Sequence, residues 1–183
     1  MLRLLDFIFA FFGLLFLWPI FLIIMVLGYF DTGSPLFFQT RVGRNKKPFT
    51  LVKFRTMPMG TQSVATHLVE SYSISKFGSF LRKTKLDELP QLINVLKGEM
   101  SLVGPRPNLF NQVELISERD KRKVYSVRPG ITGLAQVNDI DMSNPKAIAK
   151  WDMEMIQTMT MKSYFIYIIQ TVLGLSLIHI SER

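Results

Sequence analysis

A long apolar run dominates the start of the chain. From Phe7 to Phe30, between Asp6 and Asp31, no residue is charged and most are Phe, Leu, Ile, Val or Met. At a rise of about 1.5 Å per residue, one helix of this length reaches roughly 36 Å, enough to cross a hydrocarbon core of about 30 Å. Tyr29-Phe30-Asp31 is a poor signal-peptide cleavage site, so the pattern predicts a retained membrane segment.

Pro19 interrupts this run near its middle. A proline removes one backbone hydrogen bond and clashes with the preceding turn, so we expect a kink or a break in the helix. Hydropathy alone favours a kinked spanning helix over one that enters, bends and leaves on the same face. Only Arg3 precedes the run, whereas many basic residues follow it, and this asymmetry predicts that the rest of the chain is cytoplasmic. The basic residues that follow are Arg41, Arg44, Lys46, Lys47, Lys53 and Arg55.

Shorter patterned segments follow the apolar run. Pro48 to Thr56 alternates as a strand does, and Val127 to Val137 has the glycines and the proline of extended chain with tight turns. Ser79 to Leu96 places its apolar residues on one helical stripe, and Asn144 to Thr160 is a second helical candidate. Tyr164 to Leu177 is too short to span comfortably, which predicts an interfacial or packed helix. Together these segments predict a compact α+β domain on a membrane surface.

Composition narrows the chemistry. The 183 residues suffice for one modest domain with an accessory segment. The absence of cysteine excludes a disulfide framework, a thiolate zinc site and a cysteine nucleophile. His67 and His179 are the only histidines, so acid and base roles fall to carboxylates. A net charge of +8 indicates nucleic acid, anionic lipid or a phosphorylated substrate as partner.

A second basic cluster comprises Arg119, Lys121, Arg122, Lys123 and Arg128. It is either a surface for anionic headgroups or a solvated helix face. The basic clusters lack regularly interleaved aromatic residues and a nucleic-acid motif. We therefore expect no nucleic-acid partner.

Asp87 and Glu88 form an adjacent acidic pair just before Pro90. Proline costs about 3 kcal/mol deep inside a helix but little in its first turn, so a helix start near Asp87 is expected. There an ionised carboxylate meets unpaired backbone N–H groups and the positive end of the helix dipole, which also favours phosphate. The simpler interpretation is a capping Asp with a solvated Glu beside it.

Two arginines flank the acidic pair in sequence. Arg82 lies about one turn before Asp87, and Arg106 stands between Pro105 and Pro107. The prolines restrict the backbone and hold the Arg106 guanidinium in a narrow range of directions, which suits bidentate phosphate recognition. The alternative is a surface turn with an exposed arginine.

Five motifs in one order over most of the chain resemble the bacterial sugar transferases, or monotopic phosphoglycosyl transferases. The motifs are Lys53-Phe54-Arg55-Thr56-Met57, Leu86-Asp87-Glu88-Leu89-Pro90-Gln91, Asn94-Val95-Leu96-Lys97-Gly98, Met100-Ser101-Leu102-Val103-Gly104-Pro105-Arg106-Pro107 and Arg128-Pro129-Gly130-Ile131-Thr132-Gly133. The apolar start resembles the re-entrant membrane helix of that family, broken at a proline. This resemblance reverses the preference for a spanning helix.

The resemblance implies transfer of a sugar-1-phosphate from a UDP-sugar to undecaprenyl phosphate, with release of UMP, at the start of surface polysaccharide synthesis. It implies that Asp87 is the nucleophile that forms an aspartyl-phosphosugar intermediate. Glu88 then binds Mg²⁺ with Asp87, or orients and deprotonates the polyprenyl phosphate. Lys53, Arg82 and Arg106 match the phosphate- and substrate-binding positions of the family.

Two features depart from the family pattern. Tyr164 stands where many members carry an acid, and Asp152, in Trp151-Asp152, becomes a secondary candidate for substrate binding. The ending, residues 175–183, lacks the expected glycine-rich pattern and resembles a translated sequencing adapter. The expected organisation is a re-entrant membrane helix over residues 1–30, a catalytic domain over 31–174 and an atypical tail over 175–183.

The expected partners are a UDP-sugar, with an N-acetylated amino sugar favoured, undecaprenyl phosphate and membrane lipid. A homodimer and downstream glycosyltransferases are further partners that the resemblance leaves open. The expected location is the cytoplasmic face of the bacterial inner membrane. Two alternatives stand beside this prediction: a membrane-anchored glycosyltransferase that uses Asp139 and Asp141 as an Asp-x-Asp metal motif, and a non-enzymatic basic module that binds membranes.

Overall fold

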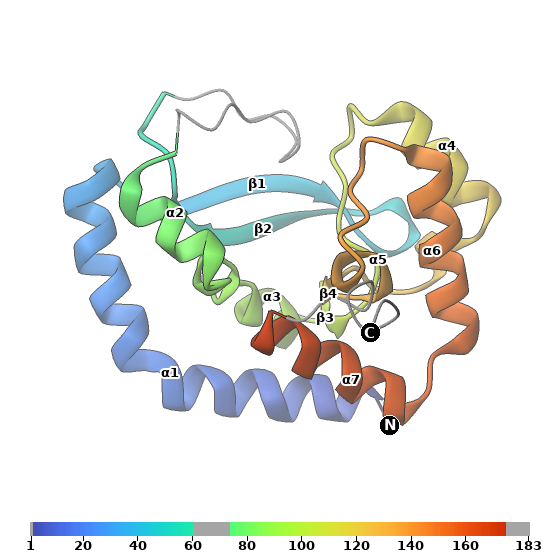
Figure 1. Cartoon of the computed structure of the whole chain (residues 1–183), viewed down its shortest axis with the longest axis horizontal. Helices are drawn as coiled ribbons and strands as arrows, with labels where there is room; N and C mark the ends of the chain where they lie inside the picture. The colour runs from blue at the N-terminus through green and yellow to red at the C-terminus, as the bar shows by residue number, and fades with distance from the viewer. Residues whose placement is uncertain (1, 61–73, 175–183) are drawn as a thin grey trace, which may run out of the picture. The chain divides into compact units, whose positions relative to one another are not determined.

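A computed structural model describes residues 2–60 and 74–174 of the chain (Figure 1). Helices and strands are mixed, which confirms the α+β prediction. The helices are α1 Leu2–Thr32, α2 Lys76–Lys83, α3 Gln91–Lys97, α4 Val113–Lys121, α5 Leu134–Val137, α6 Pro145–Thr158 and α7 Met161–Leu173. The strands are β1 Leu36–Val42, β2 Pro48–Phe54, β3 Ser101–Val103 and β4 Gly130–Thr132, and the 3-10 turns are η1 Arg44–Lys46, η4 Leu86–Glu88 and η5 Val124–Ser126.

The chain divides into two compact units. The first comprises Arg3–Thr40 and Thr50–Lys97, and the second Arg41–Phe49 and Gly98–Arg183. The domain boundaries expected after residues 30 and 174 stay predictions. His67 and the predicted tail, residues 175–183, lie outside the described residues.

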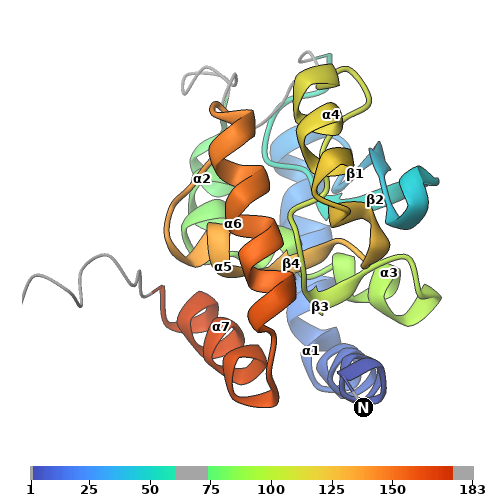
Figure 2. The ribbon, with the colours of Figure 1, turned by 90° about the vertical axis from the view of Figure 1, so that its right-hand side faces the viewer.

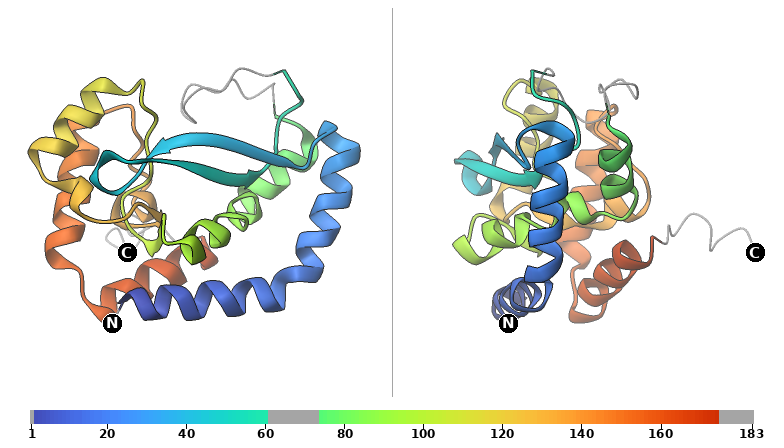
Figure 3. Two further views of the ribbon diagram at one scale, coloured as in Figure 1. Left: turned by 180° about the vertical axis from the view of Figure 1, so that it is seen from behind. Right: turned by 90° about the vertical axis from the view of Figure 1, so that its left-hand side faces the viewer.

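Helix α1 carries the predicted membrane segment. Within the described ranges it alone is long and apolar enough to cross a membrane. Figures 1 and 3 show that its axis bends sharply, and Pro19 lies inside the helix. A proline at this place explains a bend because it has no N–H to donate and crowds the preceding turn. The predicted kink is therefore present.

Helix α1 contacts the rest of the first unit near its start and in its second half. Ile24 is buried with Phe54 and Leu81 in one apolar cluster. Near the start of the helix, the Arg3 guanidinium donates to the Val95 carbonyl of α3 at 2.6 Å. Most of the large apolar side chains between these two contacts are exposed, as is typical of a surface that lipid covers.

Strands β1 and β2 form a two-stranded sheet, and the predicted strand from Pro48 is confirmed as β2. Strand β1 was not predicted. The turn between the strands contains η1, where Asn45 has a positive φ of 55°. Buried side chains alternate in the first part of β2, as expected for a strand with one face on a core.

The predicted single helix from Ser79 to Leu96 is wrong, because the chain breaks there into α2, η4 and α3. Lys85 adopts a left-handed conformation (φ 60°, ψ 10°) after α2 ends. Pro90 has no N–H and so cannot lie deep inside a helix, and α3 begins only at Gln91. Asp87 therefore lies in a 3-10 turn and not, as expected, in the first turn of a long helix.

In the second unit, β3 pairs with β4 in parallel, with Ser101 opposite Gly130 and Val103 opposite Thr132. The backbones approach so closely that a Cβ at Gly130 would lie 2.0 Å from the Gly104 nitrogen. The predicted extended segment from Val127 to Val137 is thus partly confirmed: it holds β4 and then turns into the short helix α5.

Helices α4, α5 and α6 pack together beside this pair of strands (Figure 2). Their apolar contact includes Leu115, Ala135 and Ile148. The predicted second helix is confirmed as α6, and the Asn144 side chain caps its start by accepting from the Ala147 N–H at 3.0 Å.

Helix α7 begins at Met161, three residues before the predicted start, because Thr160 and Ser163 form a capping box there. Tyr164, Tyr167 and Gln170 are its buried residues. The opposite face is apolar and exposed, and consists of Met161, Phe165, Ile166, Ile169, Val172 and Leu173.

Candidate active site

The acidic pair lies in η4 of the first unit. Asp87 is 8% exposed. Glu88 Oε1 is 3.1 Å from Lys53 Nζ of β2, and the two side chains are 11% and 15% exposed. An ion pair shielded in this way is stronger than one on an open surface, since less water screens it. Glu88 is thus not the solvated neighbour that the simpler interpretation describes.

Asn94 explains how η4 is held beside β2. Its side chain is fully buried, donates to the Thr50 carbonyl at 2.7 Å and accepts from the Val52 N–H at 3.1 Å. The amide therefore binds β2 much as a neighbouring strand would, and it anchors α3 there. Because η4 immediately precedes α3, this contact also fixes the acidic pair near Lys53.

Arg82 joins the same unit from the last turn of α2. Its Nε donates to Thr56 Oγ1 at 3.0 Å, and Nη2 approaches Met57 Sδ at 3.5 Å. Helix α2 lies close to this segment, since a Cβ on Gly78 would stand 2.2 Å from the Thr56 carbonyl oxygen. The structure thus gathers Lys53, Arg82 and the acidic pair in the first unit.

The candidate ligands for Mg²⁺ are the carboxylates of Asp87 and Glu88. In the described part of the chain, no three His, Cys, Asp or Glu side chains cluster as a metal cage would require. Mg²⁺ is commonly held by one or two carboxylates together with substrate phosphates and water. Asp87 and Glu88 are adjacent in the chain and offer the two carboxylates that this second mode uses, and Mg²⁺ binding by them stays a prediction.

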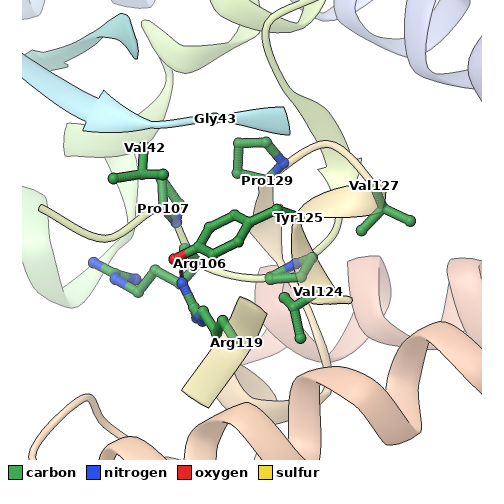
Figure 4. A pocket seen from close by; sticks show the side chains of 10 residues that line it. Val42, Gly43, Arg106, Pro107, Arg119, Val124, Tyr125, Val127 and Pro129 are labelled. Carbon is green, nitrogen blue, oxygen red and sulfur yellow. Dashed lines mark hydrogen bonds between the residues drawn. The ribbon is translucent and has the colours of Figure 1, made fainter. Parts of the chain in front are cut away.

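Arg106 lies in the second unit and lines a small pocket (Figure 4). The lining residues are Val42, Gly43, Pro105, Arg106, Pro107, Arg119, Val124, Tyr125, Val127 and Pro129. Pro105 and Pro107 are buried, whereas Arg106 is only half-buried. The two prolines are thus part of the packed interior of this unit, and phosphate binding by Arg106 stays a prediction.

Asp152 also belongs to the second unit, where it is 1% exposed and paired with Arg119. Arg119 Nη2 and Nε lie 2.7 Å and 2.9 Å from Asp152 Oδ2. Burial raises the pKa of the Asp152 carboxyl, and the Arg119 guanidinium opposes that shift. Substrate binding by Asp152 stays a prediction, and in this structure its carboxylate contacts another side chain of the protein.

The headgroup and solvated-face interpretations of the second basic cluster are both wrong for Arg119, which is 1% exposed. The sequence does carry a signal for this: Arg119 stands four residues after the buried Leu115 and so shares its helix face. Other members of the cluster bind protein groups as well. Lys121 and Arg122 pair with Glu118, whose pKa their hydrogen bonds lower, and Arg128 Nε donates to the Gly98 carbonyl at 2.7 Å.

Two further predicted positions, Asp139 and Asp141, lie in a turn before α6. Asp141 Oδ1 accepts from the Ser143 N–H at 2.8 Å and from its hydroxyl at 2.5 Å, as in a turn cap. Asp139 is exposed with a positive φ of 55°. Tyr164, at the place of the family acid, is 1% exposed.

Comparison with known proteins identifies relatives of this chain. The chain is 51% identical over 107 residues to the uncharacterized sugar transferase EpsL of Bacillus subtilis, covering 58% of this chain and 52% of EpsL. It is 32% identical to the exopolysaccharide production protein ExoY of Sinorhizobium fredii, covering 91% and 81%. It is 44% identical to the UDP-glucose:undecaprenyl-phosphate glucose-1-phosphate transferase of Escherichia coli, covering 58% and 24%.

The chain thus spans about half the length of EpsL, and less of several other curated relatives. The profile for the family described as bacterial sugar transferase matches residues 1–176. This match takes in α1, the acidic pair, Lys53, Arg82 and Arg106. The chain therefore belongs to the bacterial sugar transferase family.

Proposed function

We propose that this chain transfers a sugar-1-phosphate from a UDP-sugar to undecaprenyl phosphate and releases UMP. The observation that carries the proposal is the shielded acidic pair of the first unit, held by Lys53 and accompanied by Arg82 in the unit that also carries the apolar helix α1. The name of the Escherichia coli relative describes this type of transfer, with glucose as the sugar.

The reaction proceeds in two displacements at one phosphorus. A carboxylate oxygen of Asp87 attacks the β-phosphorus, the bond to the bridging oxygen breaks, and UMP leaves with that electron pair. An oxygen of undecaprenyl phosphate then attacks the same phosphorus, and the Asp87 carboxylate departs unchanged. A covalent intermediate of this kind lets one small site serve two substrates in turn.

Cations are needed because a carboxylate approaches an anionic diphosphate. Lys53 and Arg82 supply positive charge in the first unit, and Arg106 is the further phosphate ligand that the family motif suggests. Asp87 and Glu88 would hold Mg²⁺, which supplies further neutralisation of the diphosphate when bound. Lys53 orients Glu88, which accepts a proton from the incoming polyprenyl phosphate or binds the metal.

Membrane attachment places this chemistry near the lipid acceptor. We propose that α1 enters the cytoplasmic face of the inner membrane, bends at Pro19 and leaves by the same face. The exposed apolar face of α7 would rest in the interface. A polyprenyl phosphate has its phosphate at the membrane surface, so a shallow anchor holds the site at the level of its acceptor.

We also propose which sugar the donor carries and which proteins the chain works with. The sequence resemblance favours an N-acetylated amino sugar as the donor group. The product would pass to downstream glycosyltransferases, and a homodimer is compatible with the family. Each of these follows from the resemblance to the family.

The decisive experiment measures nucleotide release. Membranes containing the protein are incubated with a panel of UDP-sugars, undecaprenyl phosphate and Mg²⁺, and UMP and UDP are separated. We expect UMP from wild type, none from Asp87→Asn, and unchanged release from the matched control Asp139→Asn. UDP as the product, lost in Asp139→Asn, would instead support the glycosyltransferase alternative. Salt-sensitive membrane binding with no nucleotide release would support the basic module.

A further inference from the structure

The backbone from Pro105 to Asn108 is held at every carbonyl. The Pro105 oxygen accepts from the Gly130 N–H at 2.9 Å, and the Asn108 oxygen from the Val42 N–H at 2.9 Å. Between them, the Arg106 and Pro107 oxygens accept from two buried arginine side chains. The donors are Arg119 Nη1 at 2.8 Å and Arg41 Nη1 at 3.1 Å.

This segment has little freedom of its own. Pro105 and Pro107 have no N–H and a restricted φ, so the carbonyls are the groups through which their surroundings can orient them. With four successive carbonyls bound, the backbone of the segment is fixed at Arg106. The donors behind the segment thus set the point and the direction in which the Arg106 side chain leaves the backbone.

Arg119 is the centre of this arrangement. One edge of its guanidinium binds Asp152, while Nη1 donates both to the Arg106 carbonyl and to Asn108 Oδ1, at 2.8 Å and 2.9 Å. Asn108 is fully buried, and its Oδ1 also accepts from the Tyr125 hydroxyl at 3.0 Å. The planar fork of arginine makes these bonds together, which an ammonium group cannot reproduce.

Asp152 makes it feasible to bury Arg119. An isolated guanidinium at this depth would carry a large desolvation penalty, and a carboxylate at 2.7 Å offsets it. Asp152 lies on α6 and Arg119 on α4, two helices that pack together within this unit. The pair thus links the Arg106 backbone to the core of its unit.

We propose that Arg119 and Asp152 are positioning residues that hold the Pro105–Asn108 backbone so that the Arg106 guanidinium is presented to the phosphates of the nucleotide donor. This inference rests on the proposed function, since it takes Arg106 as a phosphate ligand. Asp152 then acts through Arg119 and does not itself contact substrate. Figure 4 shows Arg106, Arg119 and Tyr125 around the same small pocket.

The test is a double-mutant cycle read by UDP binding to the full chain in nanodiscs. Arg119→Lys keeps the charge opposite Asp152 but loses the fork, and should weaken UDP binding about tenfold, the order of one charge-assisted hydrogen bond. Arg106→Ala should weaken it at least as much. In the Arg106→Ala background, Arg119→Lys should have no further effect, because its influence passes through Arg106.

Arg122→Lys is the matched control, since Arg122 lies on the same stretch of chain and pairs with Glu118 near the surface. It should leave UDP binding unchanged. If Arg119→Lys does not fold, Tyr125→Phe replaces it; this removes one bond to Asn108 and should weaken UDP binding about twofold, again only when Arg106 is present.

Three outcomes would overturn the inference: equal UDP affinity in Arg119→Lys and wild type, losses that multiply in the double variant, or UDP binding that does not depend on Arg106. Binding and UMP release are measured separately. If wild type binds UDP and the cycle behaves as expected but no UMP appears, the proposed function fails and the positioning role stands.

Discussion

Lys53 Nζ lies 3.1 Å from Glu88 Oε1, and both side chains are largely shielded from water. The ammonium therefore holds the Glu88 carboxylate in one direction. Lysine can hold the carboxylate in this place only while it is itself charged. In the proposed function this pair orients Glu88, so its loss should lower the rate of transfer as well as the stability of the fold.

We predict that Lys53→Met and Glu88→Gln each lower kcat for UMP release about 100-fold, the size of a typical acid–base or orienting contribution. The double variant should be little worse than either single variant, since each removes the same interaction. Steady-state kinetics of the four proteins form the test, with Lys53→Arg as the control that keeps a cation. Losses that multiply in the double variant would contradict a shared role.

The close approach of β3 and β4 gives a prediction on stability. A Cβ on Gly130 would lie 2.0 Å from the Gly104 nitrogen, a backbone atom whose N–H donates to the Thr132 carbonyl at 2.8 Å. Gly130→Ala should therefore destabilise the second unit by about 3 kcal/mol or more, a size typical of severe backbone clashes. Chemical denaturation measures the loss.

Gly174→Ala is the comparison for Gly130→Ala. Nothing lies within 4 Å of a Cβ at Gly174, and only its positive φ of 65° is unfavourable for alanine. The expected loss is about 1 kcal/mol. Similar losses in both variants would show that the clash at Gly130 relaxes easily.

The buried hydroxyl of Tyr125 should make the stability of the fold depend on pH. Burial raises the pKa of its hydroxyl above the ordinary value of 10.0, although the nearby Arg119 charge opposes the shift. The folded state thus keeps a proton that the unfolded state loses. This contribution to stability is complete below pH 10 and is lost as the pH rises through the folded-state pKa.

The measurement compares the melting temperatures of wild type and Tyr125→Phe from pH 8.5 to about 11. Wild type should lose more stability over this range, because phenylalanine has no proton to release. Tyr167→Phe is a useful companion, since burial raises the pKa of that hydroxyl too. Parallel curves for wild type and Tyr125→Phe would argue against the shift.

The sequence predicted the elements whose pattern is local and strong. The apolar run of α1, the alternation of β2 and the Asn144-Pro145 start of α6 each depend on residues close together in the chain. Through the family motifs it also predicted that Lys53, Arg82, Arg106 and, secondarily, Asp152 would serve the site of Asp87 and Glu88. The structure places Lys53, Arg82 and the acidic pair in the first unit and Arg106 and Asp152 in the second, and a shared site stays a prediction.

The sequence analysis missed two features, a local break in a helix and a distant ion pair. Lys85 takes a left-handed conformation between α2 and η4, although its neighbours continue an apolar helical stripe. Arg119 was assigned to an exposed basic cluster because the carboxylate that makes its burial tolerable, Asp152, lies 33 residues away. The error at Arg119 reflects a tertiary contact that overrides a local preference, whereas the break of the predicted helix follows from Pro90, whose effect the apolar stripe concealed.

The bend of α1 gives the prediction with the widest consequence. Pro19 disfavours a continuous helix by about 3 kcal/mol, so leucine at this position should favour a straight one. A straight α1 would be long enough to span the bilayer, and its start would then reach the far side. Pro19→Leu should therefore convert the proposed re-entrant anchor into a spanning one.

Labelling of a single introduced cysteine tests this directly, because the chain has no cysteine of its own. In Leu2→Cys, an impermeant maleimide should label the residue only after the inner membrane is opened. In Leu2→Cys with Pro19→Leu, it should label spheroplasts from outside, whereas Leu2→Cys with Trp18→Leu, which keeps the proline, should behave as Leu2→Cys alone. Labelling of Leu2→Cys from outside in the otherwise native chain would contradict the re-entrant anchor, and the acceptor phosphate would then have to be reached by a spanning protein.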